Sequence, residues 1–312
     1  MLKKFLAMRI IHLLLVLIGI SFLSFFLANI ASVDPAEAYV RRMSRTADEE
    51  MIAQYREEFG FNQSIPRQYL SWVKNVVQFD FGNSYISGRP AMLEVVSALP
   101  HTLALSLLAC LLILLLAVPL GVASATHPGR LADKLISGFS FVAISVPGYS
   151  LGLLLLLVFG VNLKIMPVVG HGHPLSLLCG AVVLAFPMIG MLSRLLRALL
   201  LENLNSDYVI YAKARGISKR NVMRNHLLRT AAPACITMYG QNIGYLIAGT
   251  AIVETIFSTP GLGQYALNAA INRDFPVINA YIVLMAFCFI LCNTTAEIFG
   301  MLLNPAWNKE SA

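Results

Sequence analysis

The chain has 312 residues, of which 57% are hydrophobic and 12% are charged, and its mean hydropathy is +0.71. This composition excludes an ordinary soluble globular protein and indicates a protein of the lipid bilayer. The formal net charge of +7 does not indicate nucleic-acid binding, because the basic residues lie beside apolar runs and no nucleic-acid motif accompanies them.

The apolar runs predict an all-α integral membrane protein with about six transmembrane helices. The first run, Ile10 to Ile30, is long enough to span the bilayer and lacks a cleavage pattern. Five further spans are predicted at 101–125, 136–160, 176–200, 232–256 and 277–301. Pro147 and Gly148 interrupt the run at 136–160, where a proline leaves a backbone carbonyl that neighbours or water must satisfy.

Three parts are predicted along the chain: a first transmembrane helix at 1–30, an external helical segment at 31–100 and a transmembrane core at 101–312. The external segment is more acidic than basic. The capping-box pattern Thr46 to Glu49 predicts a helix that ends at Gly60. Pro66 begins a second helix, and these short helices are expected to cap the membrane bundle. The residues of the second helix predicted to face inward are Tyr69, Leu70, Val73, Val76 and Val77.

The stretch from Asn205 to Pro233 is polar and strongly basic. Since short basic segments resist translocation, it is expected in the cytoplasm, together with both termini. Ser206 and Asp207 can cap a helix that ends before Gly216, and Ser218 can cap a second helix. The six basic residues that outweigh Asp207 are Lys213, Arg215, Lys219, Arg220, Arg224 and Arg229.

Four residues of the first cytoplasmic helix recur at a helical spacing: Tyr208, Tyr211, Ala212 and Arg215. This i, i+3, i+4, i+7 pattern predicts one face with two aromatic rings and a guanidinium, which suits a groove of another protein. The alternative is an ordinary positively charged loop, and the two capped helices weigh against it.

A second candidate site lies in the predicted fifth span, where four residues share a face: Gln241, Gly244, Tyr245 and Ala248. Polar groups at membrane depth tend to face a cavity or another helix, so this face is the candidate lining of a pathway. A packing face is the alternative, because Gly240 and Gly244 would let two backbones approach closely. Glu254 and Glu297 lie near predicted helix ends, where each needs a partner or the interface, and a structural role is expected for both.

No phosphate-binding loop is present, so the chain is not expected to hydrolyse nucleotide or to act as an enzyme. His171 and His173 invite a metal hypothesis, but two histidines without further ligands are more typical of an ordinary loop. Neither a metal site nor a cofactor of this chain is expected. The five cysteines all fall in apolar segments and are predicted to pack as small hydrophobic residues.

Several short stretches together carry a family resemblance. They are Phe59-Gly60-Phe61-Asn62, Gln68-Tyr69-Leu70-Ser71-Trp72, Asp80-Phe81-Gly82-Asn83-Ser84-Tyr85, Asp207-Tyr208-Val209, Ala212-Lys213-Ala214-Arg215-Gly216, Val253-Glu254-Thr255-Ile256-Phe257 and Pro260-Gly261-Leu262-Gly263. The chain resembles, nearly end to end, the membrane-spanning permease subunit of binding-protein-dependent ABC importers of the dipeptide, oligopeptide and nickel type.

The resemblance implies a bacterial inner-membrane protein whose cytoplasmic loop, 201–231 here, carries a coupling helix that docks on a separate ATPase. Ala212 and Gly216 match the family's motif, whereas Ile210 and Tyr211 stand at its first two positions, so the motif's acidic residue is absent. The implied partners are a second permease subunit, a different chain in many relatives, two ATPase subunits or domains that bind ATP and Mg, an external solute-binding protein and membrane lipid. The implied mechanism is alternating access.

The cargo stays open at this level. The run from Asn272 to Ile278, with Cys292 and Asn293, resembles the nickel and metal-chelate branch, while peptide permeases carry similar sequences. A secondary ion-coupled transporter is the alternative of another class. It would show symmetric halves and a membrane-buried charge for ion coupling, whereas no internal repeat is evident here.

Overall fold

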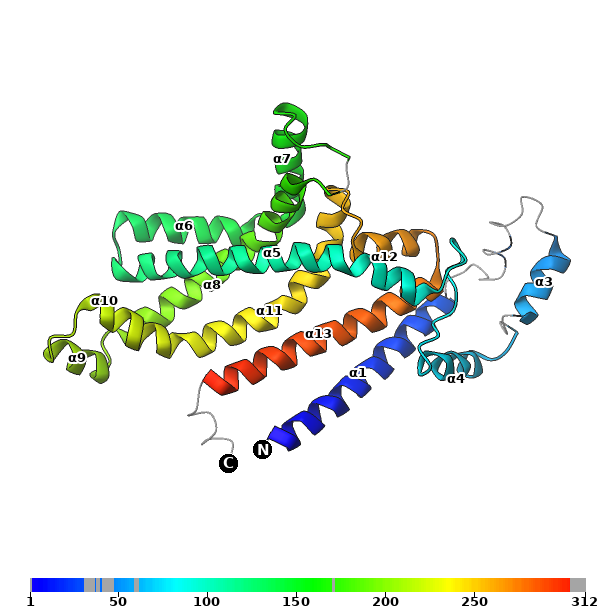
Figure 1. Ribbon diagram of the computed structural model, residues 1–312, viewed down its shortest axis with the longest axis horizontal. Helices are drawn as coiled ribbons and strands as arrows, with labels where there is room; N and C mark the ends of the chain where they lie inside the picture. The colour runs from blue at the N-terminus through cyan, green and yellow to red at the C-terminus, as the bar shows by residue number, and fades with distance from the viewer. Residues whose placement is uncertain are drawn as a thin grey trace. The chain divides into compact units, whose positions relative to one another are not determined.

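The computed structural model describes residues 2–30, 37, 40, 48–58, 62–169 and 172–303, and Figure 1 shows these residues as a set of helices. No strand occurs among them, and one isolated antiparallel bridge pairs Asn83 with Pro90. The chain forms two compact units. Unit 1 comprises residues 1–100 and 260–288, and unit 2 comprises residues 101–259 and 289–312.

The described residues form the following helices, in chain order. They are α1 (Leu2–Ile30), α3 (Glu49–Glu58), α4 (Ile65–Val76), α5 (Ala91–Thr126), α6 (Leu131–Ser145), α7 (Gly148–Leu155), the π-helix η1 (Leu156–Asn162), α8 (Pro174–Asn203), α9 (Asp207–Ala214), α10 (Lys219–Val222), the π-helix η2 (Met223–Leu227), α11 (Leu228–Ile256), α12 (Leu262–Ile271) and α13 (Phe275–Leu303).

Among the described residues, four helices are long and apolar enough to cross a membrane, and a bent pair of helices adds a possible fifth. The four segments are Met8–Phe26, Ala91–Thr126, Pro174–Asn203 and Phe275–Phe299. The helix α11 has 29 residues but is not among these four segments. An all-α membrane protein is thereby confirmed.

The predicted span at 136–160 is bent by 99° at its predicted break, between α6 and the helical segment Gly148–Asn162. The bend falls at Val146, whose extended backbone (φ −77°, ψ 122°) ends α6. A residue before proline is sterically pushed out of the helical region, and Pro147 has no N–H with which to continue the ladder. Figure 1 shows α7 turning away from α6 at this point.

In unit 1, α4 packs on α1 through aromatic side chains. The Tyr69 ring lies 5.6 Å from that of Phe25, and the Tyr69 hydroxyl lies 3.0 Å from the Ser21 hydroxyl. The predicted inward face of α4 was wrong at two positions, since Leu70 and Val77 are 66% and 75% exposed. The large rings of Tyr69 and Trp72 set the contact instead, and they turn these two aliphatic residues outward.

A helix is present where the capping box predicts one, at α3, although Thr46 and Gly60 lie outside the described residues. The loop that follows α4 is held by Asp274, a buried residue directly before α13. The Asp274 carboxylate accepts hydrogen bonds from the Ser84 hydroxyl and from the backbone N–H of Tyr85 at 3.1 Å. Residues distant in sequence thus close one loop of unit 1.

In unit 2, α8 runs through the centre of the apolar core and buries residues along most of its length. The helix α6 packs closely against α8 where small residues face each other. A Cβ atom added at Gly190 would lie 2.8 Å from the backbone oxygen of Ser140, and the hydroxyls of Ser140 and Ser193 are 3.0 Å apart. Small residues allow this close approach.

Candidate functional site

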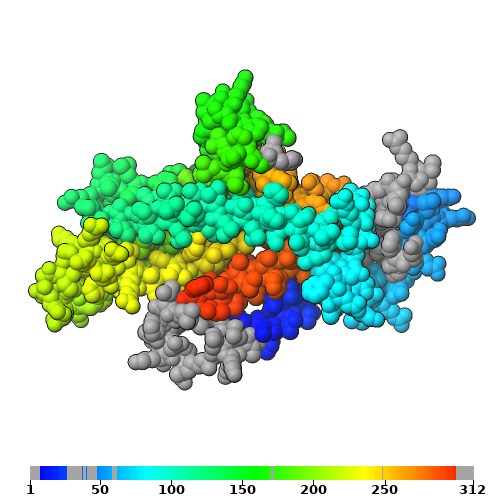
Figure 2. All heavy atoms as spheres, viewed as in Figure 1, coloured from blue at the N-terminus to red at the C-terminus, as the bar shows by residue number. Residues whose placement is uncertain are grey.

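After α8 the chain forms α9, a tight turn, and then α10 and η2, which continue into the start of α11. We call residues 205–231 the elbow. In Figure 2 the elbow forms one end of unit 2. The helix α9 ends at Ala214, and Gly216 follows with a positive φ of 76°, a conformation that glycine adopts without strain. The predicted end of this helix is therefore confirmed.

The two predicted helix caps differ. Ser218 precedes α10 and accepts a hydrogen bond from the backbone N–H of Asn221 at 3.4 Å, as predicted. Ser206 stands at the N-cap position of α9, but its side chain makes no capping hydrogen bond. Its hydroxyl donates to the backbone oxygen of Asn203 at 2.6 Å instead, because the turn that ends α8 brings this acceptor within reach.

The predicted binding face of α9 divides between surface and interior. Tyr211 is 65% exposed, and the guanidinium of Arg215 lies 5.7 Å from the centre of its ring. Tyr208 is 38% exposed, and its hydroxyl donates to the side-chain oxygen of Asn203 at the end of α8, at 3.1 Å. Ala212 is 4% exposed and packs inward with Val209. The single face was therefore a wrong prediction for Ala212, whose small apolar side chain fits the interior.

An apolar cluster joins the elbow to the ends of the long helices of unit 2. It draws on the end of α5, the last turns of α8, both short helices and the start of α11. Its buried members are Ala125, Leu196, Leu200, Val209, Ala212, Val222, Leu227 and Ala231. Displacing α9 therefore requires the ends of α5, α8 and α11 to move with it, since packed interiors resist local deformation.

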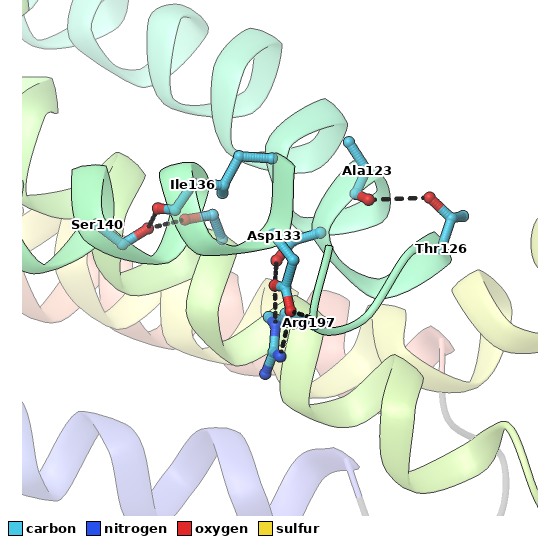
Figure 3. Close-up of polar contacts among 9 residues, drawn as sticks. Ala123, Thr126, Asp133, Ile136, Ser140 and Arg197 are labelled. Atoms are coloured by element: carbon cyan, nitrogen blue, oxygen red, sulfur yellow. Dashed lines mark hydrogen bonds and ion pairs between the residues drawn. The ribbon is translucent and has the colours of Figure 1, made fainter. Parts of the chain in front are cut away.

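Beside this cluster, Asp133 in the first turn of α6 forms an ion pair with Arg197 of α8 (Figure 3). The Arg197 Nε atom donates to one carboxylate oxygen at 2.7 Å, and Nη2 donates to the other at 2.9 Å. The backbone N–H of Gly129 donates at 2.8 Å, and the Ser124 hydroxyl also donates to Asp133. Four donors thus satisfy a carboxylate that is almost completely buried.

The candidate pathway residues on α11 do not form one surface. Gln241 and Tyr245 are exposed, and Tyr245 is 71% exposed. Gly244 packs against α13, because a Cβ atom added there would lie 2.2 Å from Phe289, and one added at Gly240 would lie 2.0 Å from the Ala296 Cβ. The two glycines fit the packing alternative. The side chain of Ala248 lies outside the described part of the structure.

The two carboxylates of the predicted later spans have different surroundings. Glu254 is fully buried, and the Thr102 hydroxyl donates to it at 2.6 Å, which provides the partner that its position demanded. Glu297 lies half-buried on α13 and also has an interaction partner.

The described residues contain no group of three side chains suited to holding a metal ion. The Nδ1 atom of His173 accepts a hydrogen bond from the backbone N–H of Leu175 at 3.3 Å, so His173 acts as a helix cap for α8. His171 lies outside the described residues.

The family described as "binding-protein-dependent transport system inner membrane component" matches residues 117–309, and the N-terminal part of such membrane components matches residues 1–106. The chain belongs to this family. It is a permease subunit of an ABC importer, and the ATPase of such a system is a separate subunit. This membership sets aside the secondary-transporter alternative and confirms the resemblance carried by the sequence motifs.

Relatives match this permease almost end to end. The metal-staphylopine import system permease protein CntB of Staphylococcus aureus is 34% identical over 97% of each chain. The oligopeptide transport system permease protein AppB of Bacillus subtilis is 35% identical over 93% of this chain and 94% of its own. The glutathione transport system permease protein GsiC of Salmonella typhimurium is 31% identical over 96% of each chain.

A solved structure shows the same fold at lower sequence similarity. The inward-facing MetNI methionine ABC transporter matches with a TM-score of 0.58 and 19% identity, and the match covers 68% of this chain and 97% of that one.

Sequence reasoning missed the ion pair of Asp133 and Arg197. Asp133 lies in the short connection between the predicted spans at 101–125 and 136–160, and Arg197 lies within the apolar run of the predicted fourth span. A charge inside such a run demands a partner, and this signal could have led to Asp133.

Proposed function

We propose that this permease imports a metal chelate, either nickel with its ligand or another metal ion held by a small organic molecule. The observation that carries the proposal is the similarity to the metal-staphylopine permease over 97% of both chains. The run from Asn272 to Ile278, with Cys292 and Asn293, supports it, because this sequence resembles the nickel and metal-chelate branch of the family.

Peptide import is the second candidate. The oligopeptide permease AppB is as similar to this chain as the metal-chelate permease is, at 35% identity. A chelate and a short peptide share chemistry, since both present carboxylate, amine and amide groups to the pathway.

The proposed topology has six spans, with both termini in the cytoplasm of a bacterial cell. It adds the bent pair of α6 and α7, and the helix α11, to the four segments selected by length and apolarity. In this topology residues 1–30 form the first span, residues 31–100 form the external segment, and residues 101–312 form the transmembrane core. The basic elbow then faces the cytoplasm, as short positively charged connections do.

We infer that the elbow is the docking element for the ATPase. The exposed Tyr211 ring and the Arg215 guanidinium supply an aromatic and cationic surface of the kind enriched at protein interfaces. Ala212 and Val209 hold this surface on the apolar cluster below it, and Gly216 shapes the turn to α10. Tyr208 fixes α9 to the end of α8.

The proposed assembly contains two permease subunits, two ATPase subunits that bind ATP and Mg, and an external solute-binding protein. Closure of the ATPase pair on ATP displaces the elbow of each permease. The apolar cluster passes this displacement to α5, α8 and α11, and the bundle opens toward the binding protein. Gln241 and Tyr245 are the exposed polar residues of α11 that would face the pathway or the second permease.

Uptake by the complete importer, reconstituted in vesicles with its binding protein, tests the cargo. Radiolabelled nickel is supplied alone, with an excess of an amino-carboxylate chelator, or with an excess of dipeptides. Chelate import predicts ATP-dependent accumulation of metal and chelator together, with little inhibition by dipeptides. Accumulation of a labelled dipeptide without metal, unaffected by the chelate, would establish the peptide candidate instead.

A further inference from the structure

We propose that Asp133 and Arg197 are positioning residues that make α6 follow the elbow when the ATPase moves it. This inference rests on the proposed coupling function of the elbow. The ion pair connects α6, through α8, to the apolar cluster on which α9 sits.

The first step of the argument is the position of Arg197 on α8. Its neighbours Leu196 and Leu200 are fully or almost fully buried, and both belong to the cluster that contains Val209 and Ala212 of the elbow. A displacement of α9 therefore reaches the segment of α8 that carries Arg197.

The second step is the geometry of the pair. Two parallel N–H···O bonds, at 2.7 and 2.9 Å, fix both the distance and the orientation of the guanidinium relative to the carboxylate. The Ser124 hydroxyl and the Gly129 N–H hold the same carboxylate, so the end of α5 and the turn before α6 are fastened at one point. The ion pair adds a directional constraint on the register of α6 along α8, which apolar contacts, being non-directional, do not supply.

The third step concerns what α6 carries. Further along α6, Ser140 makes a close contact with Ser193 and Gly190 of α8. The helix α6 then ends at the 99° bend into α7. A shift of the cytoplasmic end of α6 is therefore carried to the bend. A merely stabilising role needs no ion pair here, because well-packed apolar residues often stabilise such a site as well.

The test uses the paired variant Asp133→Asn with Arg197→Gln, which leaves no unpaired buried charge and keeps hydrogen-bonding groups at both positions. The matched control is Arg194→Gln, which removes an exposed cation of the same helix. Hydrogen–deuterium exchange is measured in the complete importer, without nucleotide and with ATP trapped by vanadate, together with uptake per ATP hydrolysed.

In the wild-type importer and in the Arg194→Gln control, ATP is expected to change exchange both in the elbow and in residues 131–145. In the paired variant the elbow should respond as before, while the response of 131–145 falls by at least about fivefold and uptake per ATP falls with it. An unchanged response of 131–145 in the paired variant would overturn the proposal.

Failure of the underlying coupling function gives a different result. If the elbow itself does not respond to ATP in the wild-type importer, both the docking role of the elbow and the role of the ion pair are overturned. If in the wild-type importer the elbow responds and 131–145 does not, only the role of the ion pair is overturned.

Discussion

Two buried aspartates hold connecting segments of this permease in place, and their hydrogen-bond partners differ in charge. Asp133 in unit 2 binds a guanidinium as well as a serine hydroxyl and a backbone N–H. The described partners of Asp274 in unit 1 are Ser84 and the N–H of Tyr85, both uncharged. An ion pair resists sliding of two helices, whereas neutral donors suffice to close a loop. The stronger of the two interactions, the ion pair of Asp133, therefore lies beside the elbow.

The largest expected effect comes from removing the cation of the ion pair between Asp133 and Arg197. Arg197→Gln leaves the Asp133 carboxylate buried without its charge partner, which should lower the free energy of unfolding by about 3 kcal/mol. Denaturant unfolding of the purified permease in detergent measures this loss, and Arg194→Gln is the control. A loss no greater than that of the control would remove the distinction between the two aspartates.

A smaller effect is expected at the loop held by Asp274. Ser84→Ala removes one neutral donor from Asp274 while the N–H of Tyr85 remains, so the free energy of unfolding should fall by about 1 kcal/mol. Faster amide exchange confined to residues 82–88 would show that the loop alone is loosened. A loss as large as that of Arg197→Gln would mean that the interactions of the two aspartates contribute equally to the free energy of unfolding.

The smallest effect concerns a further contact of unit 1, in which the Tyr265 hydroxyl donates to the Glu94 carboxylate. Burial, and then the hydrogen bond to Glu94, raises the pKa of Tyr265 above its usual value. The unfolded chain therefore loses this proton first, so the stabilisation is complete below about pH 10 and is lost as the pH rises further. Tyr265→Phe should flatten the decline of thermal stability above about pH 10. An identical decline in the variant would contradict this assignment.

Much of the fold followed from local rules. The apolar runs predicted the helices, Gly216 marked the end of α9, and Pro66 marked the start of α4. The turn of α7 away from α6 was harder to predict, because the sequence shows the breaker at Pro147 but not the 99° direction that packing gives to the bend.

The candidate sites were predicted less completely, because a helical period says which residues share a side but not which side is buried. Ala212 matched the pattern of the aromatic residues and yet lies in the interior. On α11, Gly244 packs against Phe289 while Tyr245, its neighbour in sequence, is exposed. Contacts between distant segments, such as Asp133 with Arg197, decide these outcomes.

The docking of the elbow on a separate ATPase is tested most directly by Gly216→Pro in the complete importer. Proline cannot adopt the positive φ of 76° at this turn, so the surface of α9 would be displaced while the spans stay intact. We expect ATP hydrolysis to continue and ATP-driven uptake into vesicles to be lost. Normal uptake by a well-expressed variant, or uptake that persists without the ATPase and collapses with the proton gradient, would contradict the coupling role of the elbow.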